Sequence, residues 1–193
     1  MRATAPSDRE LDELTLRRAQ RGDDEARRNL VERYHRAVHD LVWRMLGGRS
    51  RDRVEDLVQE TFVRVFTALP GFDPAGPARL STWILTIAAR LTLNERRRPP
   101  PEPLDDDPVA PDRADAGAER AHLGRALAAA IGALPDGQRA VLLLRDYHEL
   151  EYAEIAAALH IDLGTVKSRL ARGRAAVRAA LARSMPDRFG GEP

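Results

Sequence analysis

Apolar residues recur at steps of three and four along most of this chain, which is the spacing that places them on one face of an α-helix. The longest such pattern runs from about Glu25 to Leu46 and ends at Gly47-Gly48. The same spacing predicts helices over about 11–21, 51–69, 123–134, 152–159 and 163–183. Another is expected after residue 80, with Ser81 or Thr82 as its N-cap. No segment alternates between apolar and polar residues as a half-buried strand would. The pattern therefore predicts an all-α fold.

A proline-rich, acidic stretch separates two groups of predicted helices. Pro99-Pro100-Pro101 cannot continue a helix, because proline lacks the backbone N–H and clashes with the preceding turn. The 193 residues leave room for two small domains. We therefore expect two small helical domains, over about 8–98 and 118–184, joined by an extended acidic linker over 99–117.

Charge is segregated along the chain, although the net charge is only +1. Between residues 163 and 185 every charged residue is basic: Lys167, Arg169, Arg172, Arg174, Arg178 and Arg183. Between residues 99 and 118 six acids accompany a single arginine. An acid-free helix attracts phosphates, whereas the acidic stretch repels them. The segregation predicts an anion-binding surface near the C-terminus.

The composition excludes several classes of chemistry. Without cysteine, the chain cannot form disulfides, thiolate metal sites or a cysteine nucleophile. Its histidines are scattered, and it has neither a phosphate-binding glycine loop nor a cluster of carboxylates. We therefore expect no cofactor, no metal site and no enzymatic activity. The first ten residues are polar, and no apolar run approaches the roughly 20 residues of a membrane span, so we expect a cytoplasmic protein without membrane insertion.

The segment EYAEIAAALHIDLGTVKSRLARGR, residues 151–174, has the spacing of a helix-turn-helix. A short turn from His160 to Asp162 separates the two predicted helices, and histidine tolerates the positive φ that such a turn needs. The polar face of the second helix carries donors of the kind that read base edges and bind phosphates, namely Thr165, Lys167, Ser168, Arg169 and Arg172. We therefore expect this helix to bind DNA.

Besides the helix-turn-helix, two segments carry distinctive motifs, DRVEDLVQETFVRVF at residues 52–66 and FDPAGPARLSTWILTIAARLTLNERRR at residues 72–98. Together the three motifs resemble the extracytoplasmic-function (ECF) family of RNA polymerase sigma factors. The helix-turn-helix, preceded by LPDGQRAVLLLRDYHEL, is similar to the family's C-terminal promoter-reading region. DRVEDLVQETFVRVF resembles the helix that binds core polymerase, and FDPAGPARLSTWILTIAARLTLNERRR resembles the promoter-melting segment. The resemblance covers about residues 20–183. It implies a non-catalytic polymerase subunit that directs the core enzyme to promoters, with promoter DNA and an anti-sigma factor as further partners.

The resemblance also implies which residues form three binding surfaces. The polymerase-binding residues are Asp56, Gln59, Glu60, Val63 and Arg64, and the first four share one helix face. The residues for the −10 element are Phe72, Arg79, Trp83, Arg90, Asn94, Arg96 and Arg97. Those for the −35 element are Arg145, Thr165, Lys167, Ser168, Arg169, Ala171 and Arg172. Relatives often carry a larger side chain at the position of Ala171 and a more polar loop before Ser81, so these contacts depart from the usual pattern.

Two other functions remain compatible with parts of the sequence. A conventional helix-turn-helix regulator would form a homodimer and read a palindrome, but it leaves DLVQE and STWI unexplained. A helical adaptor that binds only proteins leaves the acid-free helix unexplained. Likewise, the acidic linker is either a solvated spacer or, as the resemblance implies, a segment that threads the polymerase cleft and RNA exit path.

Overall fold

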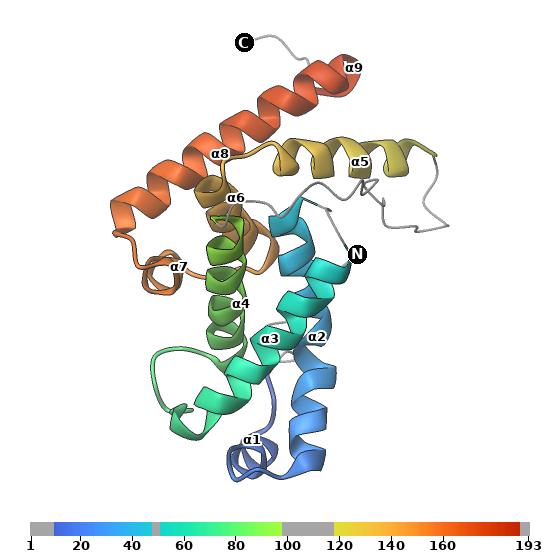
Figure 1. Ribbon diagram of the computed structural model, residues 1–193. Coiled ribbons are helices and arrows are strands. Elements are labelled where there is room, and N and C mark those ends of the chain that lie inside the picture. The colour runs from blue at the N-terminus through green and yellow to red at the C-terminus, as the bar shows by residue number, and fades with distance from the viewer. Residues whose placement is uncertain (1–9, 48–50, 98–117, 190–193) are drawn as a thin grey trace.

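The computed structural model describes residues 10–47, 51–97 and 118–189 (Figure 1). The regular secondary structure of these ranges consists of helices, which confirms the all-α prediction. The expected linker over 99–117 lies outside the described residues. None of the helices in the described ranges combines the length and the apolar character that crossing a bilayer requires.

The central element of the N-terminal half is α2, Asp24–Leu46. It packs against α1 (Glu13–Gln20), α3 (Arg51–Ala68) and α4 (Leu80–Arg96). The apolar residues that recur at steps of three and four along this helix are all buried, namely Ala26, Leu30, Tyr34, Val38, Leu41, Val42 and Met45. The Asp23 carboxylate accepts a hydrogen bond from the Ala26 N–H at 2.8 Å and so caps the helix. Gly47 ends it with a φ of 74°, a conformation that glycine adopts without strain.

The start of α4 differs from the prediction. Its N-cap is Arg79, so neither Ser81 nor Thr82 caps the helix and that prediction was wrong. Both side chains instead bind residues from elsewhere in the chain: the Ser81 hydroxyl donates to Glu10, and the Thr82 hydroxyl donates to Glu154 at 3.1 Å. The helix already begins at Leu80, so Ser81 and Thr82 lie inside its first turn rather than at the cap position.

The C-terminal half contains α5 (Ala118–Gly132), α6 (Asp136–Leu142), α7 (Tyr152–Leu159), α8 (Leu163–Ser184) and the short α9 (Pro186–Phe189). A π-helical turn, Leu143–Tyr147, continues α6. Such turns interrupt the regular hydrogen-bond ladder and are frequent at functional sites. Here the turn carries Tyr147 to α2, where its hydroxyl donates to Asp40 at 3.2 Å.

The turn between α7 and α8 has the predicted conformation. His160 has a φ of 52° and a ψ of 48°, so it adopts the left-handed region. Asp162 caps α8 by accepting from the Thr165 N–H at 2.7 Å. Hydrogen bonds from the Thr165 hydroxyl and backbone amide also hold the pKa of Asp162 below its usual value. The two caps fix where one helix ends and the next begins.

Replacing His160 with glycine should stabilise the fold by roughly 0.5–1 kcal/mol, because only glycine adopts the left-handed conformation without a steric penalty. Ala176→Gly, on the exposed middle of α8, is the matched control and should destabilise by about 1 kcal/mol. Urea denaturation followed by circular dichroism measures both. A loss of stability in His160→Gly would show that the histidine side chain matters more than its backbone conformation.

The two halves pack directly against each other. The N-terminal half's α4 lies against α6 and α7, and α2 contacts α5 and α6. Figure 1 shows α4 in green between the remaining N-terminal helices and the helix-turn-helix in orange. This packing brings residues predicted for the −10 element next to the helix-turn-helix.

Candidate nucleic-acid and polymerase interfaces

The helix-turn-helix is held together by a small apolar crossing. Ile155 on α7 and Val166 and Leu170 on α8 are buried, and Ala156 packs half-buried against the same core. A reciprocal capping box fixes the start of α7, in which Glu154 accepts from the Glu151 backbone N–H at 2.7 Å. The crossing leaves the opposite face of α8 at the surface.

That opposite face carries the residues predicted for the −35 element. Lys167, Ser168, Ala171 and Arg172 are exposed, and Thr165 is half-buried. The Arg172 guanidinium donates from Nε to the Ser168 carbonyl at 3.2 Å and from Nη2 to the Ser168 hydroxyl at 3.3 Å. These contacts hold the side chain along the helix surface. The structure therefore brings Lys167, Ser168 and Arg172 together on one exposed face.

The other two predicted −35 residues make contacts within the C-terminal half. Arg145 donates to the Leu150 carbonyl at 2.8 Å and pairs with Glu151 at 3.0 Å. Arg169 is half-buried and lies over the first turn of α6. A Cβ at Gly137 would come within 2.9 Å of the Arg169 Nη1, so the missing side chain at that glycine makes room for the guanidinium.

The residues predicted to bind polymerase form an exposed face of α3. Asp56, Gln59, Glu60, Val63 and Arg64 are all exposed, and Val63 retains 64% of its accessible surface. The opposite face packs into the core through Val54, Leu57, Val58 and Phe62. Within the exposed face, Arg64 pairs with Glu60 at 2.7 Å. An exposed valine among carboxylates is well suited to a protein partner with a basic surface.

The loop before α4 lines one side of an open cavity of about 800 Å³. Its other side is α1, which contributes Glu13, Arg17 and Gln20, followed by Arg21 just after the helix. Phe72 and Arg79 line the same cavity. The centroid of the Phe72 ring lies 5.0 Å from that of the half-buried Trp83. The lining mixes apolar side chains with arginines and with the carboxylates of Glu10, Glu13 and Asp73. The Phe72 ring and the guanidinium groups are the parts of this lining that suit an unstacked base and its phosphates.

Gln20 is a residue of this cavity that sequence reasoning missed. Its side-chain amide donates to the Leu69 carbonyl at 3.0 Å and to the Phe72 carbonyl at 2.7 Å. These bonds tie the loop to α1 across about 50 positions of sequence. Nothing in the spacing of apolar residues indicates such a contact, because a glutamine on a helix surface is usually solvated.

The rest of the predicted −10 set divides into two groups. Asn94 and Arg97 are exposed at the end of α4. Arg90 instead donates to the Ala158 and Ala157 carbonyls of α7, at 2.5 and 2.9 Å. Arg96 pairs with Asp136 at the start of α6 at 2.6 Å. Two of the predicted DNA contacts are therefore engaged by the C-terminal half.

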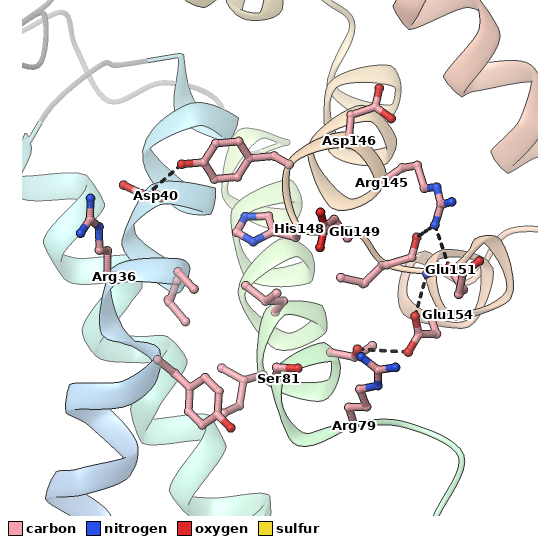
Figure 2. Close-up of a pocket in the computed structure, with 18 of the residues that line it drawn as sticks. Arg36, Asp40, Arg79, Ser81, Arg145, Asp146, His148, Glu149, Glu151 and Glu154 are labelled. Atoms are coloured by element: carbon pink, nitrogen blue, oxygen red, sulfur yellow. Dashed lines mark hydrogen bonds and ion pairs between the residues drawn. The ribbon is translucent and has the colours of Figure 1, made fainter. Parts of the chain in front are cut away.

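A second cavity of about 1090 Å³ lies between the two halves. Figure 2 shows Arg36, Asp40 and Ser81 on the N-terminal side, and the turn that carries His148 and Glu149 on the other. Its rim mixes arginines with carboxylates, and Glu151 and Glu154 lie at the same edge. Within the described ranges, no group of three or more histidine, aspartate or glutamate side chains is arranged to hold a metal ion.

Comparisons with known proteins match both halves. The family model for sigma-70 region 2 matches residues 30–99, and that for sigma-70 region 4 matches residues 124–177. The ECF RNA polymerase sigma factor SigW of Bacillus subtilis is 32% identical over 183 residues, which cover 86% of this chain and 94% of SigW. The sigma-E factor of Escherichia coli K12 is 31% identical, with 89% of this chain and 94% of the relative covered.

Two solved structures have the same fold as this chain. CnrH, solved in complex with the cytosolic domain of CnrY, superposes with a TM-score of 0.63 at 27% identity, over 88% of this chain and 96% of CnrH. The fold is also that of RpoE from Bartonella quintana, with a TM-score of 0.61 at 20% identity over 80% of this chain and 95% of RpoE. The region 2 match accounts for the DLVQE and STWI segments that a conventional regulator leaves unexplained. The chain belongs to the ECF family of RNA polymerase sigma factors, and it directs the polymerase to promoters for the initiation of transcription.

Proposed function

We propose that this sigma factor divides promoter recognition between its two halves. The N-terminal half, about residues 8–98, binds core polymerase through the exposed face of α3 and opens DNA at the −10 element. The C-terminal half, about residues 118–184, holds the −35 duplex, and residues 99–117 link the two. Promoter DNA and polymerase lie in the bacterial cytoplasm, so we place its action there. The chain contributes no catalytic residue, because nucleotide addition belongs to the polymerase.

The observation that carries this proposal is the separation of two unlike surfaces. The exposed face of α3 presents Asp56, Glu60 and Val63. Its two carboxylates suit a basic protein surface and would be repelled by DNA. The exposed face of α8 presents Lys167 and Arg172 without a neighbouring acid on that helix. One chain therefore offers one surface to a protein and another to a duplex.

The cavity beside Phe72 is the proposed site for an unstacked −10 base. Phe72 would stack against the base with the Trp83 ring packed against it, and Arg79 would hold a neighbouring phosphate. Gln20 holds the loop closed against α1 through its two bonds to the Leu69 and Phe72 carbonyls. Asn94 and Arg97 extend the same surface along α4 toward the upstream DNA.

A regulatory protein partner is part of the proposal. CnrH was solved with the cytosolic domain of CnrY, and the Bartonella RpoE with the anti-sigma factor NepR. By analogy with CnrH, we propose that an anti-sigma factor binds this chain as well. Affinity purification of the tagged chain from its host tests this, and recovery of polymerase without such a partner would point to another mode of control.

Replacing both Lys167 and Arg172 with alanine should lower transcription from a −35-dependent promoter at least about tenfold, since each such contact contributes roughly 1–3 kcal/mol of base discrimination. The test adds the purified chain to core polymerase and a promoter library, then measures initiation. Arg178→Ala, another exposed basic residue of α8, is the control and should change little. Equal losses in both variants would mean that α8 contributes only general positive charge.

A further inference from the structure

We infer that the C-terminal half of this chain acts as a competitor of −10 DNA, because it occupies the two arginines that the DNA needs. The closed arrangement seen in the structure and binding of the −10 strand by Arg90 and Arg96 would exclude each other. The inference rests on the proposed function, together with the assignment of both arginines to the −10 element that the family resemblance implies. It concerns the chain before it joins the polymerase.

Arg90 is held by two backbone carbonyl oxygens at the end of a helix. Its guanidinium donates from Nε to the Ala158 carbonyl at 2.5 Å and from Nη2 to the Ala157 carbonyl at 2.9 Å. These carbonyls belong to the last turn of α7, which ends at Leu159. The C-terminal turn of a helix carries partial negative charge on carbonyls that have no partner within the helix. Two oxygens of this kind satisfy a guanidinium much as two phosphate oxygens do.

Arg96 is held by a carboxylate at the same boundary between the halves. Its Nε donates to Asp136 at 2.6 Å, and its Nη1 donates to the Leu46 carbonyl at 3.4 Å. The Arg96 side chain is 20% exposed, and that of Asp136 is 37% exposed. The pair is therefore shielded from solvent on one side and accessible on the other. A phosphate that takes the Nε donor of Arg96 must displace Asp136.

The apolar core runs through both halves, and the other polar contacts between them are of a kind that water can replace. Tyr147, which is 42% exposed, donates to Asp40 at 3.2 Å, and the Arg44 guanidinium lies 4.3 Å from the Tyr147 ring centroid. The Thr82 hydroxyl donates to Glu154. Water can replace each of these partners after separation, so opening leaves no isolated charge in an apolar environment.

Arg139 is the one buried arginine among the described residues, and its contacts also allow the halves to separate. It donates to the Met45 carbonyl of α2 at 2.6 Å. Its other donors bind the Ile131, Gly132 and Leu134 carbonyls within the C-terminal half. Separation of the halves therefore removes the Met45 acceptor and keeps the three acceptors within the C-terminal half, so that part of the C-terminal core can stay intact on opening.

The first experiment weakens closure without changing either arginine. Asp136→Asn combined with Tyr147→Phe removes the carboxylate that holds Arg96 and the hydroxyl that binds Asp40. The full chain is titrated into a fluorescent single-stranded oligonucleotide carrying the −10 strand of a promoter that the holoenzyme transcribes. We expect the affinity to rise about tenfold over the unmodified chain, as loss of a hydrogen bond to a charged group predicts. Asp146→Asn is the matched control, because Asp146 pairs with Arg174 inside the C-terminal half, and it should not raise the affinity.

Adding Arg90→Ala and Arg96→Ala to the unmodified chain and to the Asp136→Asn, Tyr147→Phe chain tests the competition and the −10 assignment separately. If affinity rises on opening and these substitutions remove the gain, the inference holds. If the substitutions weaken binding equally in the unmodified and opened chains, and opening itself adds nothing, the −10 assignment stands and the competition is wrong. If the substitutions change binding in neither chain, the −10 assignment of the two arginines is wrong and the inference falls with it.

The second experiment follows the distance between the halves directly. The chain has no cysteine, so Ala68→Cys and Ala176→Cys, both at exposed positions, accept a donor and acceptor dye pair. Addition of the same oligonucleotide should change the energy transfer with the same midpoint as binding. Saturating DNA binding with constant energy transfer would overturn the inference, because it would show that the closed arrangement and the −10 strand coexist.

Discussion

Replacing Asp56 with arginine is expected to reduce promoter-directed transcription by this sigma factor on the order of 100-fold, because like charges at a protein interface cost several kcal/mol. Asp56 is exposed on the face of α3 that we assign to the polymerase, and its nearest basic group is Arg53 on the same helix, at 3.7 Å. The substitution removes no buried contact, so the melting temperature should change little. Transcription with purified core polymerase measures the loss, and competition against another sigma factor measures the affinity.

Two further variants make this prediction specific. Val63→Glu should produce a similar loss, because the exposed valine is expected to be buried on docking, where an unpaired carboxylate is costly. Glu32→Arg, an equal charge reversal at an exposed position of α2, should leave transcription within about twofold, as expected for surface substitutions away from a binding site. Comparable losses in Glu32→Arg and Asp56→Arg would assign the effect to overall charge and contradict the proposed docking face.

The long helices could be predicted closely from the sequence because their apolar periodicity is strong. The helix expected over about 163–183 is Leu163–Ser184 in the structure, and that expected over 51–69 is Arg51–Ala68. The left-handed turn at His160 also followed from local preference. The position of Arg79 as N-cap did not follow from the sequence. The hydroxyls of Ser81 and Thr82, which suit a cap, instead bind Glu10 and Glu154, and these two residues are remote in sequence.

The packing between the halves could not be predicted, because it depends on side chains that look like ordinary surface residues in the sequence. Arg90, Arg96 and Arg139 belong to basic or mixed stretches, and charged residues of this kind are usually solvated. The candidate surfaces were identified by resemblance to a family, and the structure shows which of their residues are accessible. Arg169 illustrates the limit: its place over Gly137 depends on how α8 crosses α6, which spacing within α8 does not specify.

Replacing Arg139 with leucine is expected to lower the free energy of unfolding by about 3–5 kcal/mol, which makes it the most destabilising substitution that we predict. Arg139 is 3% exposed, and its guanidinium donates to four backbone carbonyls, those of Met45, Ile131, Gly132 and Leu134. Leucine fills part of the volume but removes the arginine donors of the Met45, Gly132 and Leu134 carbonyls, whereas the Ile131 carbonyl still accepts from the Leu134 N–H. Each unsatisfied group costs roughly 1–3 kcal/mol. For a chain of this size the melting temperature should fall by roughly 10 °C.

Two companion variants distinguish hydrogen bonding from charge at this position. Arg139→Lys keeps the charge but has three donors on one nitrogen and cannot reproduce the planar fork, so it should recover only part of the lost stability. Arg178→Leu removes an exposed arginine from α8 and should change the free energy of unfolding by no more than about 0.5 kcal/mol. Thermal and urea denaturation of the full chain measure all three. If Arg139→Leu unfolds at the same denaturant concentration as Arg178→Leu, then water must replace the guanidinium as the donor to the Met45, Gly132 and Leu134 carbonyls. The junction between α2, α5 and α6 would then admit water despite its burial.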